Sequence, residues 1–177
     1  MDARYNRTAR VLHWLLALLL LGQLIFGWWL EAVPRNTPLR GYVVNLHKSV
    51  GIVIGLLVLA RLVWRLSHAA PTLPDVVPRW QRRLAAVSHR LLYGLMLLVP
   101  LAGYLASNFS KYGVKFFNTV LLPPWAPEDK PLYTLLNQTH QVAVLLLVIL
   151  VAVHVGAALV HALRRDGIFS RIWLRPF

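Results

Sequence analysis

The sequence contains no cysteine among its 177 residues. Disulfides, iron–sulfur clusters, thiolate chemistry and covalent haem attachment through a C-x-x-C-H motif are therefore excluded. Acidic residues are also scarce, with 6 Asp and Glu against 19 Lys and Arg. Charged residues make up 14% of the chain and hydrophobic residues 58%, whereas a soluble domain has roughly one quarter charged residues. This composition predicts a protein that is embedded in a lipid bilayer.

The formal net charge of +13 at pH 7 would also suit a nucleic-acid-binding protein. However, the arginines flank apolar runs instead of covering a polar face. Cations in such positions are typical of the flanks of membrane helices. We therefore expect membrane lipid as a partner and no nucleic acid.

Four apolar runs, at about residues 11–30, 44–66, 84–107 and 139–163, have the length of roughly twenty residues that crosses a bilayer. Each is expected to be a helix, because backbone polar groups in lipid must be satisfied within the segment. The first run is too long for a signal peptide and has no clear cleavage site, so we interpret it as a retained anchor. The predicted fold is all-α, an integral membrane four-helix bundle forming a single domain over residues 1–177.

The basic residues divide unevenly between the two ends of the expected helices. Six lie at one end: Arg35, Arg40, Lys48, Lys111, Lys115 and Lys130. The others lie at the opposite end: Arg4, Arg7, Arg10, Arg61, Arg65, Arg79, Arg82, Arg83, Arg90, Arg164, Arg165, Arg171 and Arg175. Because Lys and Arg concentrate on the cytoplasmic side of membrane proteins, both termini are expected in the cytoplasm. The aromatic loop at residues 108–136 then lies outside, on the bilayer surface or folded over the mouth of the bundle.

Six of the seven histidines lie in or at the ends of the apolar runs: His13, His47, His89, His140, His154 and His161. A histidine within a membrane helix is costly unless it has a partner. For a single histidine, a hydrogen bond across helices is a sufficient explanation. Several histidines at matched depths favour a bound cofactor instead.

The fourth run places two of these histidines on one helical face. His140 and His154 are 14 residues apart, which is nearly four full turns at about 100° per residue. Their axial separation of about 21 Å puts one site in each half of a roughly 30 Å hydrocarbon core. One metal ion cannot contact both rings, whereas two flat cofactors stacked one above the other can.

Each site needs a second ligand from another helix. His47 begins the second run at the level of His140, and His13 begins the first run near the level of His154. These pairs would give each of two haem irons two imidazoles, which leaves no open coordination position and favours electron transfer over oxygen binding. A zinc site would need three or four ligands close together, and the runs supply no such cluster. His89 enters the third run as deep as His13, so depth alone leaves open which of them binds the inner haem.

Other residues of the second run also suit a haem protein. Gly51 and Gly55 follow His47 on the same face, where missing side chains would let a porphyrin lie flat; a contact between small residues of two helices is the alternative. Arg61, helped by Arg65, would pair with the propionates of the inner haem, or would extend to lipid headgroups. The corresponding candidates at the outer haem are Arg35, Arg40 and Lys48.

Five segments give the sequence a resemblance to a known family. They are VLHWLL opening the first run, NLHKSVGI opening the second, RLVWRL closing it, SHRLLYGLMLLVPLAGY in the third, and His-x13-His with a further histidine in the fourth. Over nearly its whole length the chain resembles the bacterial cytochrome b561 family, which is related to the membrane cytochromes of nickel hydrogenases and formate dehydrogenases. The resemblance implies a four-helix bundle with two b-type haems and ligands from the first, second and fourth helices: His13, His47, His140 and His154.

The resemblance also implies a quinone close to the cytoplasmic haem, beside a residue that exchanges its proton. His89 and His161 are then free for that role, and histidine titrates in a suitable range. His161, about two turns from His154 on the same face, is the first candidate and His89 the second. Trp14 and Arg79 are weaker candidates, and anchoring at the membrane interface is the alternative for all of them.

Some members of the family are superoxide oxidases, and they resemble this chain in length and in having no soluble partner domain. The resemblance implies electron transfer across the bacterial inner membrane, from periplasmic superoxide to ubiquinone. The anion would be attracted by a positive funnel at the outer face, although Glu128 and Asp129 weaken it. The candidates for this funnel are Lys48, Lys111, Lys115 and Lys130, with Arg35 and Arg40.

Two other functions remain open at this point. A carrier cytochrome would pass electrons between quinone and a docked redox partner, such as a hydrogenase-type complex, and would need a larger exposed surface than these short loops offer. A membrane protein without a cofactor would use its histidines to hold helices together, but that use does not require four histidines at two matched depths. We therefore expect an oxidoreductase that transfers electrons from superoxide to ubiquinone.

Overall fold

The computed structural model describes residues 4–72 and 77–174, and these ranges contain four long helices. They are α1 (Arg7–Ala32), α2 (Pro38–Ser67), α3 (Arg79–Asn108) and α4 (Lys130–Arg164). All four are long and apolar enough to cross a membrane, and each expected span lies inside one of them. The prediction of an all-α membrane four-helix bundle is confirmed. Of the basic residues used to infer orientation, Arg175 lies outside the described ranges.

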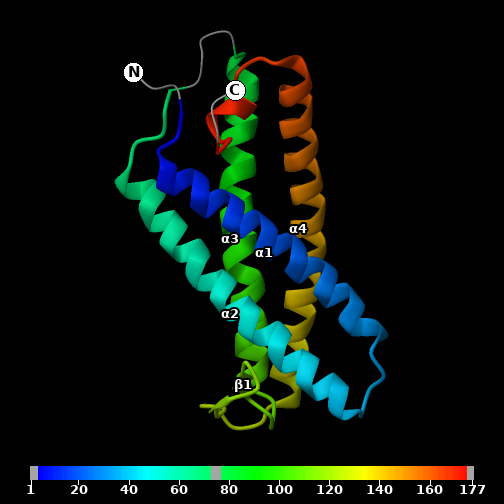
Figure 1. The fold of residues 1–177 in the computed structure, drawn as a ribbon. Helices are drawn as coiled ribbons and strands as arrows, with labels where there is room; N and C mark the ends of the chain where they lie inside the picture. The colour runs from blue at the N-terminus through cyan, green and yellow to red at the C-terminus, as the bar shows by residue number, and fades with distance from the viewer. Residues whose placement is uncertain (1–3, 73–76, 175–177) are drawn as a thin grey trace.

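The helices form two pairs that cross each other obliquely (Figure 1). Helix α1 packs against α2, α3 packs against α4, and α2 packs against α3 to join the pairs. Within the described part of the chain, α3 is the only membrane helix that packs closely on α4. Both ends of the chain lie at one end of the bundle, and the α3–α4 connection lies at the other. The four passes therefore leave the termini on the same side of the membrane.

Side-chain caps decide where three of the helices begin. The side chains of Asn6, Thr37 and Asp129 each accept a hydrogen bond from a backbone N–H one turn later. Pro131 in the first turn of α4 lacks an N–H at a position where none is needed. Helix α4 consequently begins at Lys130, well before the expected span at residue 139, because hydropathy marks contact with lipid whereas the cap marks the helix.

The bundle has a small core at mid-height and an apolar outer surface. Between 6% and 17% of the residues in each span are buried, so most apolar side chains face outward, as lipid contact requires. The central core cluster takes residues from all four helices: Leu16, Ile54, Val58, Leu92, Met96 and Leu147. Leu147 is fully buried and lies midway in sequence between His140 and His154. A layer of packed hydrocarbon therefore separates the two histidine levels of α4.

The long outer loop forms a hairpin that rests on α2. Strand β1 (Val114–Phe116) pairs with β2 (Val120–Leu122) in antiparallel register. The backbone N–H of Phe117 donates to Oγ of the fully buried Ser49, at 2.7 Å. Of the two positions expected for this loop, the structure thus has the one in which it folds over the end of the bundle.

The C-terminal segment closes the opposite end. After α4 it turns through a short 3-10 helix, η1 (Phe169–Arg171), which packs against α4. The guanidinium of Arg171 is buried and donates to the carbonyls of Pro71 (2.5 Å) and Thr72 (3.1 Å). The C-terminal segment is thus bonded to residues 71 and 72, which follow α2.

The contact between the hairpin and α2 is testable with one substitution. Ser49→Ala removes the acceptor of the Phe117 N–H, and a typical intramolecular hydrogen bond contributes about 0.5–1.5 kcal/mol. We expect faster hydrogen exchange in residues 113–122 in detergent micelles. Ser67→Ala, on the same helix but exposed and bonded only to nearby groups, is the matched control. Equal exchange in both variants would contradict the assigned contact.

Candidate functional site

The outer histidine pair joins α2 to α4. The ring centroids of His47 and His140 are 6.4 Å apart, and their planes meet at 83°. Nδ1 of His140 lies 2.8 Å from the carbonyl oxygen of Val99 on α3. A carbonyl only accepts, so Nδ1 carries the proton and Nε2 keeps a free lone pair. His140 is thus held in the tautomer that a metal ligand needs.

The inner histidines form a group of three. His13 on α1 and His154 on α4 have ring centroids 6.4 Å apart, at 65° between planes. His89 on α3 lies at 5.5 Å from His154. The structure therefore brings together both residues that depth in the membrane left as alternatives.

The spacing of both pairs fits a metal held between two rings. Two imidazoles that share a metal through bonds of about 2.0 Å have ring centroids roughly 6 Å apart. The pairs His47–His140 and His13–His154 have equal separations at two different levels of the bundle. Among residues 4–72 and 77–174, no group of three or more His, Cys, Asp or Glu is placed to hold a metal ion. The paired arrangement suits two haem irons better than one closed metal site.

Two polar side chains approach the other ligands through their Nδ1 atoms. Nη2 of Arg61 lies 3.0 Å from Nδ1 of His13, and the side-chain nitrogen of Gln23 lies 3.1 Å from Nδ1 of His47. A guanidinium only donates, so its contact requires an unprotonated Nδ1, whereas iron on Nε2 requires a protonated one. If His13 held an iron through Nε2, Arg61 would have to turn away from Nδ1 and would then be available to a propionate. At His47 the amide nitrogen of Gln23 also donates to the His47 carbonyl at 2.7 Å, so the amide would accept from a protonated Nδ1 only if it turned and gave up that bond.

The two glycines singled out in α2 face other helices. A Cβ on Gly51 would lie 3.7 Å from the Gln23 side chain of α1, and one on Gly55 would lie 3.3 Å from Cγ of Pro100 on α3. Gly55 therefore has the role given above as the alternative, a close contact between helices. Gly51 borders the residue that approaches His47.

The four quinone-site candidates lie at the inner end, but their surroundings differ. His161 is paired with Asp166, its Nδ1 at 2.5 Å from a carboxylate oxygen. Trp14 donates to the carbonyl of Ile172 at 3.0 Å, and its ring lies 5.5 Å from that of His13. Arg79 is exposed at the first residue of α3. His89 alone among the four lies against the ring of His154.

The outer cations gather at the hairpin end of the bundle. Lys48 is half-buried and donates to the carbonyl of Gly113 at 3.0 Å, so it also fastens the hairpin. Lys111, Lys115 and Lys130 are exposed. Arg35 is exposed as well, whereas Arg40 donates to the carbonyls of Leu30 and Val33 and pairs with Glu31 at 3.5 Å.

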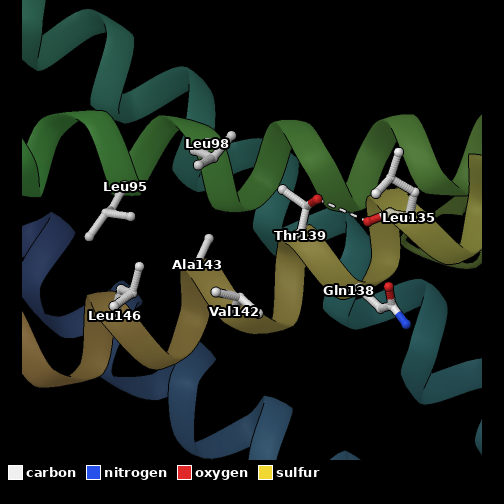
Figure 2. A pocket seen from close by; sticks show the side chains of 8 residues that line it. All are labelled: Leu95, Leu98, Leu135, Gln138, Thr139, Val142, Ala143 and Leu146. Atoms are coloured by element: carbon white, nitrogen blue, oxygen red, sulfur yellow. Dashed lines mark hydrogen bonds between the residues drawn. The ribbon is translucent and has the colours of Figure 1, made fainter.

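An open groove of about 310 Å³ lies between α3 and α4 (Figure 2). Its only polar lining residues are Gln138 and Thr139, and the Thr139 hydroxyl donates to the carbonyl of Leu135 at 2.9 Å. No lining residue titrates, so the groove offers no proton donor for a quinone. We assign it no redox role.

Sequence analysis missed four residues that contact the outer ligands: Gln23, Gly27, Val99 and Gly103. Gln23 had a signal, because it is a polar residue in the middle of the first apolar run. Val99 had none, since it acts through its backbone carbonyl. The role of Gly27 and Gly103 could not be predicted, because it depends on the histidine rings that the fold places beside them.

The hydrogen bond between His161 and Asp166 at the inner end also shifts the pKa of Asp166. Burial alone would raise the pKa of this carboxyl, but hydrogen bonds from His161 and from the N–H of Ile168 hold the pKa below its usual value. Such a carboxylate adds stability that is present above its ordinary pKa of about 3.9 and is lost as the pH falls through the lowered value.

We expect His161→Ala to raise the pKa of Asp166 toward about 3.9, because the largest favourable contact of the carboxylate is removed. The measurement is a carbon NMR titration of the Asp166 carboxyl in detergent micelles. His68→Ala, at the exposed end of α2, should leave the titration unchanged. If His161→Ala leaves it unchanged too, the hydrogen bond is not the cause of the shift.

Comparison with known proteins agrees with this geometry. The sequence profile of a family described as prokaryotic cytochrome b561 matches residues 4–174. The chain is 25% identical over 179 residues to cytochrome b561 homolog 1 of Escherichia coli (strain K12), covering 97% of this chain and 98% of that protein. It is 30% identical over 122 residues to cytochrome b561 homolog 2 of the same strain, covering 68% and 64%. The chain therefore belongs to the prokaryotic cytochrome b561 family, as a multi-pass b-type cytochrome of the bacterial inner membrane that transfers electrons.

Proposed function

We propose that this cytochrome holds two b-type haems and oxidises superoxide at the outer face of the membrane, with ubiquinone as the electron acceptor. One haem lies between His47 and His140, and the other between His13 and His154. The observation that carries the proposal is the pair of equal ring separations, 6.4 Å, at two levels of the same helix. In this proposal the hairpin end is periplasmic and both termini are cytoplasmic.

The overall reaction balances with two anions for each quinone. Two superoxide anions lose one electron each and leave as dioxygen, while ubiquinone gains two electrons and two protons to become ubiquinol. When bound, the two haems supply one-electron transfer between the substrates. The protein's own residues have to hold the rings, attract the anion and deliver the protons.

At the outer face, the exposed cations give superoxide a favourable approach. Lys111, Lys115 and Lys130 surround the hairpin end, where they attract a small anion from solution. Asp129 opposes them less than its charge suggests, because its side chain caps α4 and accepts from the N–H of Leu132 at 2.9 Å.

At the inner face, we place the proton transfer to quinone on His89. Its ring lies 5.5 Å from the ring of His154, close enough to serve a quinone that takes electrons at this level. His161 is engaged with Asp166, which leaves it as the second candidate. Trp14 and Arg79 would serve to position the quinone.

Removing single histidines tests the ligand assignment. His13→Ala should lose the inner haem and keep the outer one, because one of its two axial ligands is gone. His89→Ala, from the same cluster, should keep both haems and slow ubiquinone reduction. Haem content per chain and the visible spectrum of the purified variants provide the readout. If His89→Ala loses a haem and His13→Ala does not, the inner ligands are His89 and His154 instead.

Superoxide itself tests the substrate. We expect enzymatically generated superoxide to reduce the purified, oxidised protein, with the haem bands reoxidised on addition of ubiquinone and no reduction when superoxide dismutase is present. Replacing Lys111, Lys115 and Lys130 with Gln should lower the bimolecular rate and its dependence on ionic strength. A haem spectrum that superoxide leaves unchanged would contradict the proposal and point to a carrier cytochrome with a docked redox partner.

A further inference from the structure

We infer that two short segments, Gln23 with Gly27 on α1 and Val99 with Gly103 on α3, are seats that fix the ring planes of the outer ligands. Each seat joins a polar group to a glycine one helical turn later. The inference rests on the proposed ligation of the outer haem by His47 and His140. It adds four positioning residues to that site.

The first seat holds His47 from α1. The side-chain nitrogen of Gln23 lies 3.1 Å from Nδ1 of His47 and donates to the His47 carbonyl at 2.7 Å. One turn later, a Cβ on Gly27 would lie 3.0 Å from Cε1 of the same ring. The ring is thus contacted along its Nδ1–Cε1 edge. Because the amide nitrogen is a donor, a metal on Nε2 would require the Gln23 amide to turn so that its oxygen accepts from Nδ1.

The second seat has the same spacing along its helix and holds His140 from α3, but its polar group accepts a hydrogen bond from the ring instead of donating one. The carbonyl of Val99 accepts from Nδ1 at 2.8 Å. One turn later, a Cβ on Gly103 would lie 3.1 Å from Nδ1 and 3.3 Å from Cε1 of the ring. Both outer ligands are therefore held on the same edge, each by the helix that precedes its own in the chain.

These contacts are close enough that a Cβ at either position would require the imidazole ring to shift by a few tenths of an ångström. Carbon contacts are optimal at about 3.5–4.0 Å, so an added methyl group at Gly27 or Gly103 would push its imidazole aside. A displaced ring also loses alignment with the polar group of its seat. We therefore expect the glycines to help hold the two ring planes at the 83° angle that the structure has.

The inner ligands have no comparable seat. Among the glycines of the described chain, none would place a Cβ within 4 Å of His13 or His154 as one of its nearest neighbours. Gly22 on α1 and Gly94 on α3 would meet nothing within 4 Å. The inner histidines are instead approached by other side chains, Arg61 at Nδ1 of His13 and the ring of His89 beside His154.

The ligand-plane angle has a spectroscopic signature. In a low-spin ferric haem with two imidazoles, the angle between their planes controls the splitting of the iron d orbitals. Electron paramagnetic resonance (EPR) reads this splitting directly as the anisotropy of the g values. A near-perpendicular pair gives a strongly anisotropic signal. A change in the angle between the two imidazole planes therefore shifts that signal even when the haem stays bound.

The test compares glycine substitutions within the same helices. Gly27→Ala and Gly103→Ala add a methyl group against an outer ligand, whereas Gly22→Ala and Gly94→Ala add the same group to open space on α1 and α3. The full haem-loaded protein in detergent is measured by EPR, by haem content and by redox titration of each haem. His140→Ala identifies which signal belongs to the outer haem.

We expect Gly27→Ala and Gly103→Ala to shift the largest g value of the outer haem and to weaken its haem affinity roughly 10-fold or more, as loss of outer-shell support does. The inner haem signal and both control variants should match the wild type. Retention of a native inner haem shows that each variant is folded. Gln23→Leu should shift the midpoint potential of the outer haem alone.

Two results would overturn the seats. An outer-haem signal and affinity unchanged in Gly27→Ala and Gly103→Ala would do so while leaving the ligation intact. Equal changes at both haems, or in the control variants, would show a general packing effect instead. By contrast, His140→Ala that keeps both haems would contradict the ligation itself, which separates failure of the seats from failure of the proposed function.

Discussion

Placing imidazole rings inside a lipid-facing bundle is the constraint on which the rest of the structure depends. Such rings are costly in a membrane unless each has a partner. The two histidines of α4 lie on one helical face but about 21 Å apart along the helix axis. Their partners must therefore come from two different depths. Consecutive antiparallel helices begin at opposite sides of the membrane, and a histidine near the start of each supplies one ring at each depth. This explains why His13 and His47 can both face α4 from neighbouring helices.

The other contacts of the bundle separate the two histidine levels and cover the two ends of the bundle. The hydrocarbon layer around Leu147 fills the space between the levels with side chains from all four helices. The hairpin fastened to Ser49 covers the outer end, and the C-terminal segment with Arg171 covers the inner end. The cations at both ends of the bundle can attract anionic groups, such as haem propionates, lipid headgroups or a soluble anion. In the proposed function, this arrangement would give electrons a path between the two faces of the membrane.

The spans and the paired depths could be predicted from the sequence, because hydropathy and helical periodicity depend on the chain alone. The sequence could not predict whether His13 or His89 faces the ring of His154, because both histidines have the same depth. The structure places both near that ring. The start of α4 was set by a cap outside the apolar run. The support from Val99 is a backbone carbonyl, which any residue has. Contacts of this kind depend on how helices cross, which the order of residues does not reveal by itself.

The central claim is that two haems lie at two levels, each between α4 and one helix of the α1–α2 pair. The most direct measurement is an electron-density or cryo-electron microscopy map of the haem-loaded protein in lipid nanodiscs. The account predicts two irons about 21 Å apart along α4, one between His47 and His140 and one between His13 and His154. A single haem, or an inner iron bound by His89 in place of His13, would contradict it.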